Sequence, residues 1–342
     1  MKYTICKLAI KPLALHRWTF LFAMVFCCCF VYNVLTREAY SQNAFTSAVV
    51  ANVDSGESLY AYQIDRRIHP ASLTKIMTAY IVFDAINSGS IGLYDKVDLM
   101  QYANIGLPDV FSYQETATIQ ELLVKLAVNS CNACAVALAN EVVNSEYEFV
   151  KLMNKKAKDL HMLNTHFTNS HGLNDPYHFS TARDIAILSI SMIKQYPELS
   201  QIFSITDYII DDNFTTKTTT IQRENQYITG SKTGYTSESG YNIAIWGEKN
   251  GAKIVIVIIG ADSKYNRDII ALNIMQHIHT SGNNLLATQT QKKSGFIAYT
   301  EQLSSIIGKY LCAYLNIDNN MDNNIHMEEH EEKQENRFYI NQ

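Results

Sequence analysis

Three short groups of polar residues have the composition of a site for nucleophilic catalysis. They are Ser72-Leu73-Thr74-Lys75, Ser130-Cys131-Asn132 and Lys232-Thr233-Gly234. A serine hydroxyl is a poor nucleophile until a nearby base removes its proton. On a helix, Lys75 lies on the same face as Ser72 because the two residues are three positions apart. The first group therefore predicts a serine nucleophile with a lysine base.

The second group could complete the proton transfers. A lysine accepts a proton only if its pKa falls towards neutrality, which burial and a neighbouring cation such as Lys232 would cause. Ser130 could relay a proton to a departing amine, and Asn132 could orient the substrate and Lys75.

The third group suits a substrate carboxylate. Lys232 and Thr233 supply a positive charge and a hydroxyl, and Gly234 lets the backbone come close to a ligand. Each pattern alone is weak, because similar ones recur at Ser191-Met192-Ile193-Lys194, Ser41-Gln42-Asn43 and Ser281-Gly282-Asn283. The order of the three groups along the chain, and their places in the predicted elements, indicate that they form one catalytic site.

Predicted strands at both ends of the segment and helices between them indicate an α+β domain. The strand-like runs are Ala48–Ala51, Leu59–Tyr62, Asn242–Trp246 and Ile254–Ile259, and the turns are Asp54-Ser55-Gly56 and Lys249-Asn250-Gly251. The helical patterns are Ser72–Ile86, Ile119–Val143, Glu148–Leu160 and Thr181–Ile193. In this scheme Ser72 opens a helix after Pro70, Ser130 interrupts one, and Lys232 leads into a strand hairpin.

The first 41 residues have the pattern of an export signal. Several basic residues precede a charge-free apolar run from Trp18 to Leu35, and Ala39-Tyr40-Ser41 resembles a cleavage site. The run of about 18 residues could also span a bilayer if cleavage fails. We expect residues 1–41 to be a signal peptide or signal anchor, and the rest to lie in the periplasm or at the outer face of the inner membrane.

Composition excludes several classes of protein. A hydrophobic fraction of 47% and a charged fraction of 18% are typical of a globular protein with a large core. A net charge of −5 does not indicate a protein that binds nucleic acid. Cys131-x-x-Cys134 resembles a redox or zinc pair but lacks a second Cys/His pair, so we interpret both cysteines as small buried residues. His277-x-His279 is interpreted as a pair of surface or satisfied core residues rather than as a zinc site, and neither a metal nor a cofactor is expected.

The end of the chain differs in character from the rest. We expect a catalytic domain over residues 45–280, a connector and an amphipathic helix over 281–317, and a disordered acidic tail over 318–342. The polar connector is Gly282–Gly295, and the helical stripe runs from Tyr299 to Leu315. Whether 18–35 or 299–315 associates with a membrane stays open.

From Phe45 to Ile278 the sequence resembles the serine-type D-alanyl-D-alanine carboxypeptidases, or low-molecular-mass penicillin-binding proteins, of the penicillin-recognising serine enzymes. Beside the three groups, the resemblance rests on Met153–Ala157, Thr165–Leu173, Ser180–Asp184, Gly260–Ser263 and Arg267. It implies a β-lactamase/DD-peptidase-like α+β fold, with an antiparallel sheet flanked by helices and an additional all-helical cluster.

The resemblance also implies a reaction and its residues. The enzyme would remove the terminal D-alanine from peptidoglycan stem pentapeptides in cell-wall synthesis and remodelling, and would bind β-lactams. By this resemblance Ser72 is the acylated nucleophile, Lys75 the proton acceptor and Ser130 the third catalytic residue. The backbone N–H groups of Ser72 and Tyr235 would form the oxyanion hole. The expected substrate-binding residues are Asn132, Lys232, Thr233, Gly234, Tyr235 and Arg267.

Two departures and two alternatives remain. Cys131 stands where the family usually has a small residue, and the roughly 60 residues after Ile278 do not match the family's all-β second domain, which we expect to be missing. A β-lactamase would need a glutamate between Asn169 and Asp184, where the only acids are Asp175 and Asp184. A catalytically inactive peptidoglycan-binding module is the other alternative.

Overall fold

The computed structural model describes residues 45–102, 116–210, 213–217, 219–249 and 251–285. The predicted export signal, the amphipathic helix and the acidic tail lie outside these residues, so each stays a prediction.

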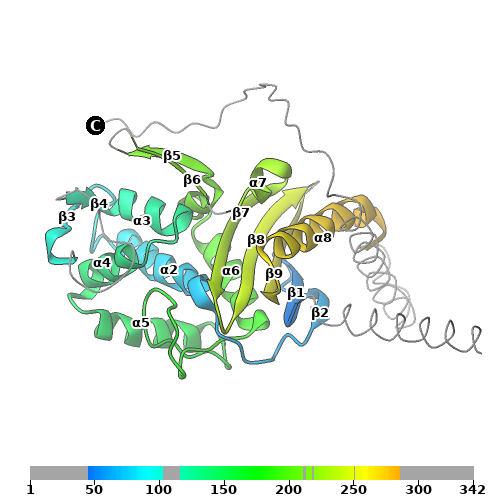
Figure 1. Cartoon of the computed structure of the whole chain (residues 1–342), viewed down its shortest axis with the longest axis horizontal. Coiled ribbons are helices and arrows are strands. Elements are labelled where there is room, and N and C mark those ends of the chain that lie inside the picture. Colours follow the sequence, from blue (N-terminus) through cyan, green and yellow to red (C-terminus); the bar gives the residue numbers. More distant parts are fainter. Residues whose placement is uncertain (1–44, 103–115, 211–212, 218, 250, 286–342) are drawn as a thin grey trace, which may run out of the picture. The chain divides into compact units, whose positions relative to one another are not determined.

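A five-stranded antiparallel sheet forms the centre of the described part (Figure 1). The strand order is β2-β1-β9-β8-β7. The bounds are β1 Ser47–Asn52, β2 Ser58–Tyr62, β7 Ile228–Thr236, β8 Gly240–Lys249 and β9 Ala252–Ala261. Two hairpins that the sequence predicts, β1–β2 and β8–β9, pair in antiparallel register. The pairing of β1 with β9 then joins the two ends of the domain, as expected.

Strand β9 is buried on both faces, which explains its uninterrupted apolar sequence. Val255, Val257 and Ile259 belong to the main hydrophobic core, whereas the alternate residues Ile254 and Ile256 point to the opposite face. Helix α6 contacts β1, β8 and β9, and helix α8 contacts β8 and β9. The sheet is therefore covered by helices on both sides.

Helices α2 to α6 lie close to the ranges that the sequence predicts, whereas α7 and α8 were not predicted. Their bounds are α2 Thr74–Asn87, α3 Ile119–Val128, α4 Asn132–Val143, α5 Glu146–Asp159, α6 Ala182–Gln195, α7 Ile221–Glu224 and α8 Lys264–Leu285. Helix α3 starts with a capping box between Thr118 and Glu121, in which each side chain accepts the other's backbone N–H. The predicted interruption at residues 129–132 separates α3 from α4.

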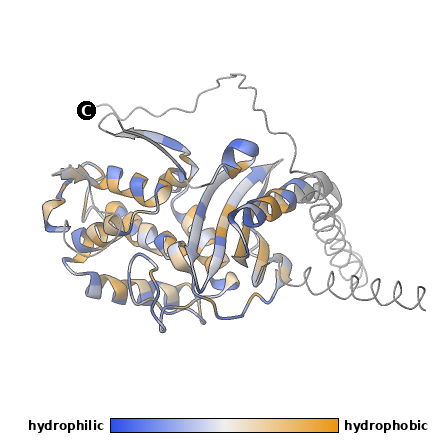
Figure 2. Ribbon diagram, viewed as in Figure 1, coloured by the Kyte–Doolittle hydropathy of each residue, from blue (hydrophilic) through white to orange (hydrophobic). Residues whose placement is uncertain are grey.

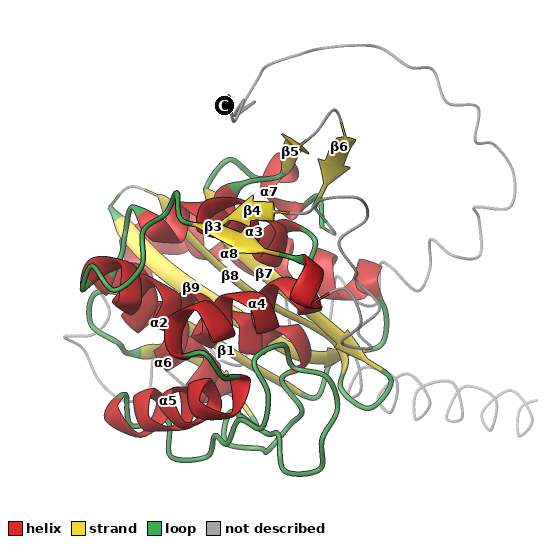
Figure 3. Cartoon of the chain, turned by 90° about the vertical axis from the view of Figure 1, so that its left-hand side faces the viewer, coloured by secondary structure: helices red, strands yellow, loops and turns green. Residues whose placement is uncertain are grey.

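Helices α2 to α5 form the additional helical cluster, beside the sheet (Figure 3). Hydrophobic and hydrophilic residues alternate along α3 and α8 in the ribbon coloured by hydropathy (Figure 2). Buried residues of α2, such as Tyr80 and Phe83, pack into the same core as β9. The cluster thus fixes the start of α2 against the sheet.

Short elements complete the described part. Two small two-stranded sheets pair β3 Lys96–Asp98 with β4 Thr116–Thr118, and β5 Asp207–Ile210 with β6 Asn213–Thr216. The 3₁₀ segments are η1 Ala71–Leu73, η2 Met100–Tyr102 and η3 Leu199–Ser204. Among the described helices, none has the length and hydropathy needed to cross a bilayer.

Two details differ from the sequence predictions. Helix α8 continues to Leu285, past Gly282, where a polar connector was expected to begin. The first turn after Pro70 is 3₁₀ rather than α-helical, so Ser72 precedes the α-helix instead of opening it. The expected α+β architecture, with an antiparallel sheet flanked by helices, is nevertheless confirmed.

Candidate active site

Ser72 lies in the 3₁₀ turn η1, between the start of α2 and the edge strand β7. The preceding residue, Ala71, has a φ of +49°, a conformation that costs a non-glycine residue about 1–2 kcal/mol. Such strain persists only where the surroundings fix it, and it is frequent at functional sites. The turn presents a half-buried Ser72 side chain at the end of a fully packed helix.

The Lys75 amine reaches Ser72 from the first turn of α2. Its Nζ lies 3.0 Å from Ser72 Oγ, 2.7 Å from Asn132 Oδ1 and 2.6 Å from the carbonyl oxygen of His171. Lys75 is completely buried, so these oxygens replace water around the amine. The spacing of three residues thus brings the amine to the hydroxyl within hydrogen-bond distance.

Ser130 and Lys232 form a second contact pair. Lys232 Nζ donates to Ser130 Oγ at 2.9 Å and to the Thr233 carbonyl at 2.8 Å. Ser130 has a φ of +62° between α3 and α4, which directs the chain out of one helix and into the next. The break between the helices therefore places Ser130 beside Lys232 and Asn132 beside Lys75.

Cys131 and Cys134 are joined by a disulfide, with their Cα atoms 5.3 Å apart. Both residues are buried, as the sequence predicts, but they form a disulfide, which the sequence analysis did not predict. Cys131 also caps α4, because its Sγ accepts the backbone N–H of Cys134 at 3.0 Å.

The site contains several buried basic side chains. Burial lowers the pKa of Lys232 well below its ordinary value, and three neighbouring cations lower it further: Lys75, Lys217 and Arg267. Burial also lowers the pKa of Lys217 to about 7. Arg267 is 3% exposed, and its Nη2 is the one buried side-chain nitrogen or oxygen of the described residues without a hydrogen-bond partner. Such a site is suited to an anion.

Strand β7 packs closely on η1 at Gly234. A Cβ on Gly234 would lie 3.1 Å from the Ser72 nitrogen and 3.1 Å from the Pro70 oxygen. Glycine at this position therefore allows β7 to approach the nucleophile itself, and the next residue is Tyr235, whose side chain is 56% exposed. Residues 72 and 235, whose N–H groups the resemblance assigns to the oxyanion hole, therefore belong to two elements that are in contact.

The sequence motifs omit one part of the site, the turn Ser170–Gly172. Its His171 carbonyl accepts from Lys75, and Gly172 has a φ of +87°. A Cβ on Gly172 would lie 1.9 Å from the Ala71 carbonyl oxygen, so this turn packs directly on η1. The run Ser170-His171-Gly172 is visible in the sequence, but its backbone role depends on tertiary packing.

Neither acid of the 169–184 segment is placed like a deacylating glutamate. Asp184 is 2% exposed and accepts hydrogen bonds from the Asn164 backbone and the Thr165 hydroxyl. Asp175 accepts the backbone N–H of Tyr177 within its own loop. Among the described residues, no cluster of three or more His, Cys, Asp or Glu side chains could hold a metal ion. The side chains of His277 and His279 lie outside the described part.

A family model described as D-alanyl-D-alanine carboxypeptidase matches residues 34–263. The chain belongs to this family. It is 35% identical over 230 residues to D-alanyl-D-alanine carboxypeptidase DacF of Bacillus subtilis, covering 65% of this chain and 59% of the relative. It is 30% identical over 277 residues to DacC of Escherichia coli, covering 78% and 68%. The chain spans about three fifths of the length of the first curated relatives that it matches.

Solved structures of penicillin-binding proteins have the same fold as this chain. Penicillin-binding protein 5 of Haemophilus influenzae superposes with a TM-score of 0.65 at 29% identity, over 68% of this chain and 70% of that one. Penicillin-binding protein D2 of Listeria monocytogenes, in a cefotaxime-bound form, gives 0.61 at 28% identity, over 67% and 95%. The fold and the family that the sequence resembles are thus confirmed.

Proposed function

We propose that this chain is a serine DD-carboxypeptidase that removes the terminal D-alanine from peptidoglycan stem pentapeptides through an acyl-enzyme on Ser72. The observation that carries the proposal is the 3.0 Å contact between Lys75 Nζ and Ser72 Oγ, in a chain of the carboxypeptidase family. Proton transfer needs hydrogen-bond distance, and this contact provides it.

In the acylation step, neutral Lys75 takes the Ser72 proton as Oγ attacks the carbonyl carbon of the penultimate D-alanine. The backbone N–H groups of residues 72 and 235 stabilise the oxyanion. Ser130, whose hydroxyl accepts a hydrogen bond from Lys232, relays the proton from Lys75 to the nitrogen of the leaving D-alanine. The C–N bond then breaks, and the peptide stays attached to Ser72 as an ester.

The buried basic side chains of the site select a substrate that ends in a carboxylate. Lys232, Thr233 and Arg267 hold the terminal carboxylate of the substrate, and the orphaned Nη2 of Arg267 supports its part in this role. Asn132 holds Lys75 and lines the same site, with Gly234 and Tyr235 along the edge strand. Water then attacks the ester, with Lys75 again as the base. The same residues fit β-lactams, which acylate the serine in place of the peptide.

The location of the enzyme follows from this substrate. Peptidoglycan is outside the cytoplasm, so the protein acts in the periplasm or at the outer face of the inner membrane. We propose residues 1–41 as the export signal or anchor, 45–280 as the catalytic domain, 281–317 as a connector with an amphipathic helix, and 318–342 as the tail. Finding the mature N-terminus near Gln42 in a periplasmic fraction would support cleavage, whereas a cytoplasmic protein that retains Met1 would contradict export.

Release of D-alanine from a stem pentapeptide tests the reaction. Ser72→Ala is expected to abolish release. Ser191→Ala is the matched control, because Ser191 also precedes a lysine by three residues, and it should leave the rate unchanged. Wild-type release by Ser72→Ala would contradict the nucleophile. An active wild type that hydrolyses penicillins but not the pentapeptide would favour the β-lactamase alternative, and a wild type that binds peptidoglycan without any turnover would favour the binding module.

A further inference from the structure

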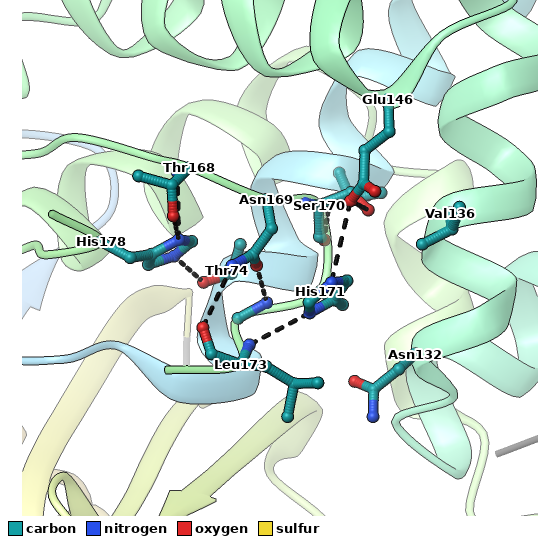
Figure 4. A network of polar contacts seen from close by, with 12 residues as sticks. Thr74, Asn132, Val136, Glu146, Thr168, Asn169, Ser170, His171, Leu173 and His178 are labelled. Carbon is teal, nitrogen blue, oxygen red and sulfur yellow. Dashed lines mark hydrogen bonds and ion pairs between the residues drawn. The ribbon is translucent and has the colours of Figure 1, made fainter. Parts of the chain in front are cut away.

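Glu146 contacts the turn that holds Lys75, although it comes from another element. It is the first residue of α5, directly after the N-cap Ser145. Its Oε1 accepts the backbone N–H of Ser170 at 2.9 Å and the Ser170 hydroxyl at 2.6 Å. The same oxygen lies 3.9 Å from Nε2 of His171. Figure 4 shows Glu146 pointing from the start of α5 to Ser170 and His171.

Further hydrogen bonds fix the turn around these contacts. The Thr78 hydroxyl donates to the Ser170 carbonyl, and Asn169 Oδ1 accepts the Gly172 N–H at 2.6 Å. Because residues 170 and 172 are both held, the carbonyl of His171 between them has little freedom. It accepts from Lys75 Nζ at 2.6 Å, the shortest of the three amine contacts given above. The turn thus sets the position of one ligand of the proposed base.

The ring of His171 faces Glu146 as a neutral donor. Its Nδ1 accepts the Leu173 N–H at 3.1 Å, which places the ring proton on Nε2, on the side of Glu146. Burial lowers the pKa of His171 to about 4; Glu146 raises it and Lys75 lowers it. The imidazole therefore carries no charge at neutral pH, and the Glu146 carboxylate contacts neutral donors of this turn rather than an imidazolium.

We propose that Glu146 is a positioning residue for acylation: its carboxylate holds the Ser170–Gly172 turn so that the His171 carbonyl keeps the Lys75 amine directed at Ser72. This inference rests on the proposed function, since it assigns the residue to the same reaction. The positioning role explains why the Glu146 side chain, although 30% exposed, directs Oε1 inwards to a backbone N–H instead of to solvent. A misplacement of about 1 Å at the reacting groups can cost up to 100-fold in rate.

The competing role for Glu146 is that of a deacylation base. The two roles differ in the half-reactions that they affect. A residue that positions Lys75 affects acylation, and deacylation as well because Lys75 is the proposed base of both steps, whereas a water-activating base acts only on the ester. Hydrogen bonds from both donors of Ser170 occupy Oε1, which favours positioning.

The test measures acylation and deacylation separately with a fluorescent penicillin, normalised to active sites by burst titration. Glu146→Ala is expected to slow acylation about 10- to 100-fold, with an unchanged affinity for the carboxylate-bearing ligand. Glu146→Gln keeps an oxygen acceptor and should stay within about threefold of wild type. Glu148→Ala is the matched control, because Glu148 lies in the same first turn of α5 but pairs with the exposed Lys151, and it should not change either rate.

The remaining outcomes of this experiment also decide for or against the proposed role of Glu146. If Glu146→Ala fails to fold, Glu146→Asp withdraws the carboxylate by one methylene, keeps the charge at the helix start, and should still slow acylation. Normal acylation in both variants would overturn the proposal, and so would a loss confined to deacylation. A wild-type protein that no penicillin or peptide acylates would instead refute the proposed function itself.

Discussion

At the scale of single residues, the central feature is an amine surrounded by three oxygens. The nucleophile, an amide and a backbone carbonyl all contact Lys75 Nζ within 3.0 Å. The spacing Ser-x-x-Lys predicts only the first of these contacts. The other two depend on how α4 and the 170–172 turn pack against α2.

Replacing Lys75 by methionine tests the base directly. Methionine keeps most of the apolar stem but cannot accept a proton, so acylation by a fluorescent penicillin should slow by about 10²- to 10⁴-fold. Lys194→Met is the control, since Lys194 follows Ser191 in the same pattern but bonds the Asp54 carbonyl at the surface. Equal acylation rates in the two variants would contradict the role of Lys75.

Short sequence motifs predict the contacts of this site only where the two residues are close together in the sequence. Ser72 and Lys75 are three residues apart on one helical segment, so their contact follows from helix geometry. Glu146 was not predicted, because it lies 24 residues before Ser170 and no spacing rule connects a helix start with a distant turn. The disulfide was not predicted, because Cys131 and Cys134 were interpreted only as small buried residues, whereas the start of α4 brings them together.

At the scale of elements, the break between α3 and α4 carries both Ser130 and Asn132. The polar run of residues 129–132 predicts that break correctly. The short hairpin β5–β6 was not predicted, because its strands have only four residues each and show no clear alternation of apolar and polar residues. Helix α8 was also not predicted, and its packing on the far face of β8 and β9 explains why those strands are apolar on both faces.

Removal of the Cys131–Cys134 disulfide should weaken this part of the fold. A bridge that closes a loop of four residues stabilises the folded state by about 2 kcal/mol in the chain-entropy model. In Cys131→Ala/Cys134→Ala we expect the melting temperature to fall by about 4–8 °C. An unchanged melting temperature, with both wild-type thiols free to alkylation, would show that the bridge does not form.

The 170–172 turn should not tolerate a side chain at Gly172. Gly172→Ala combines a φ of +87° with a Cβ 1.9 Å from the Ala71 carbonyl oxygen, so we expect a loss of about 4 kcal/mol or more and little acylation. Gly89→Ala isolates the backbone strain, because Gly89 has a φ of +74° but nothing within 4 Å of the added carbon. It should cost only about 1–2 kcal/mol. Similar urea midpoints for the two variants would mean that the turn is not packed on η1 as described.

At the scale of the whole domain, two buried histidines link stability to pH. Burial lowers the pKa of His171 to about 4 and that of His178 to about 3. His178 also lies 2.8 Å from the Thr74 hydroxyl through Nε2, beside the start of α2. Below pH 6.5 the unfolded chain binds protons at these rings that the folded chain refuses, so protonation favours unfolding.

Stability should therefore be fully present above pH 6.5 and decrease as the pH falls towards 4 and then 3. Each histidine contributes up to about 1.4 kcal/mol per pH unit in its window. Carboxylates also titrate in this pH range, so wild type must be compared with His178→Gln. The free energy of unfolding of His178→Gln should fall less steeply than that of wild type between pH 6.5 and pH 4.5. Parallel pH profiles for the two proteins would contradict a neutral, buried His178.

The central claim is that Ser72 forms the acyl-enzyme, and locating the attached group tests it most directly. Wild-type protein is incubated with benzylpenicillin, digested and analysed by mass spectrometry. We predict one added penicilloyl group, on the peptide that contains Ser72, and no addition in Ser72→Ala. Attachment at Ser130 or Ser191, or the same addition in Ser72→Ala, would contradict the account.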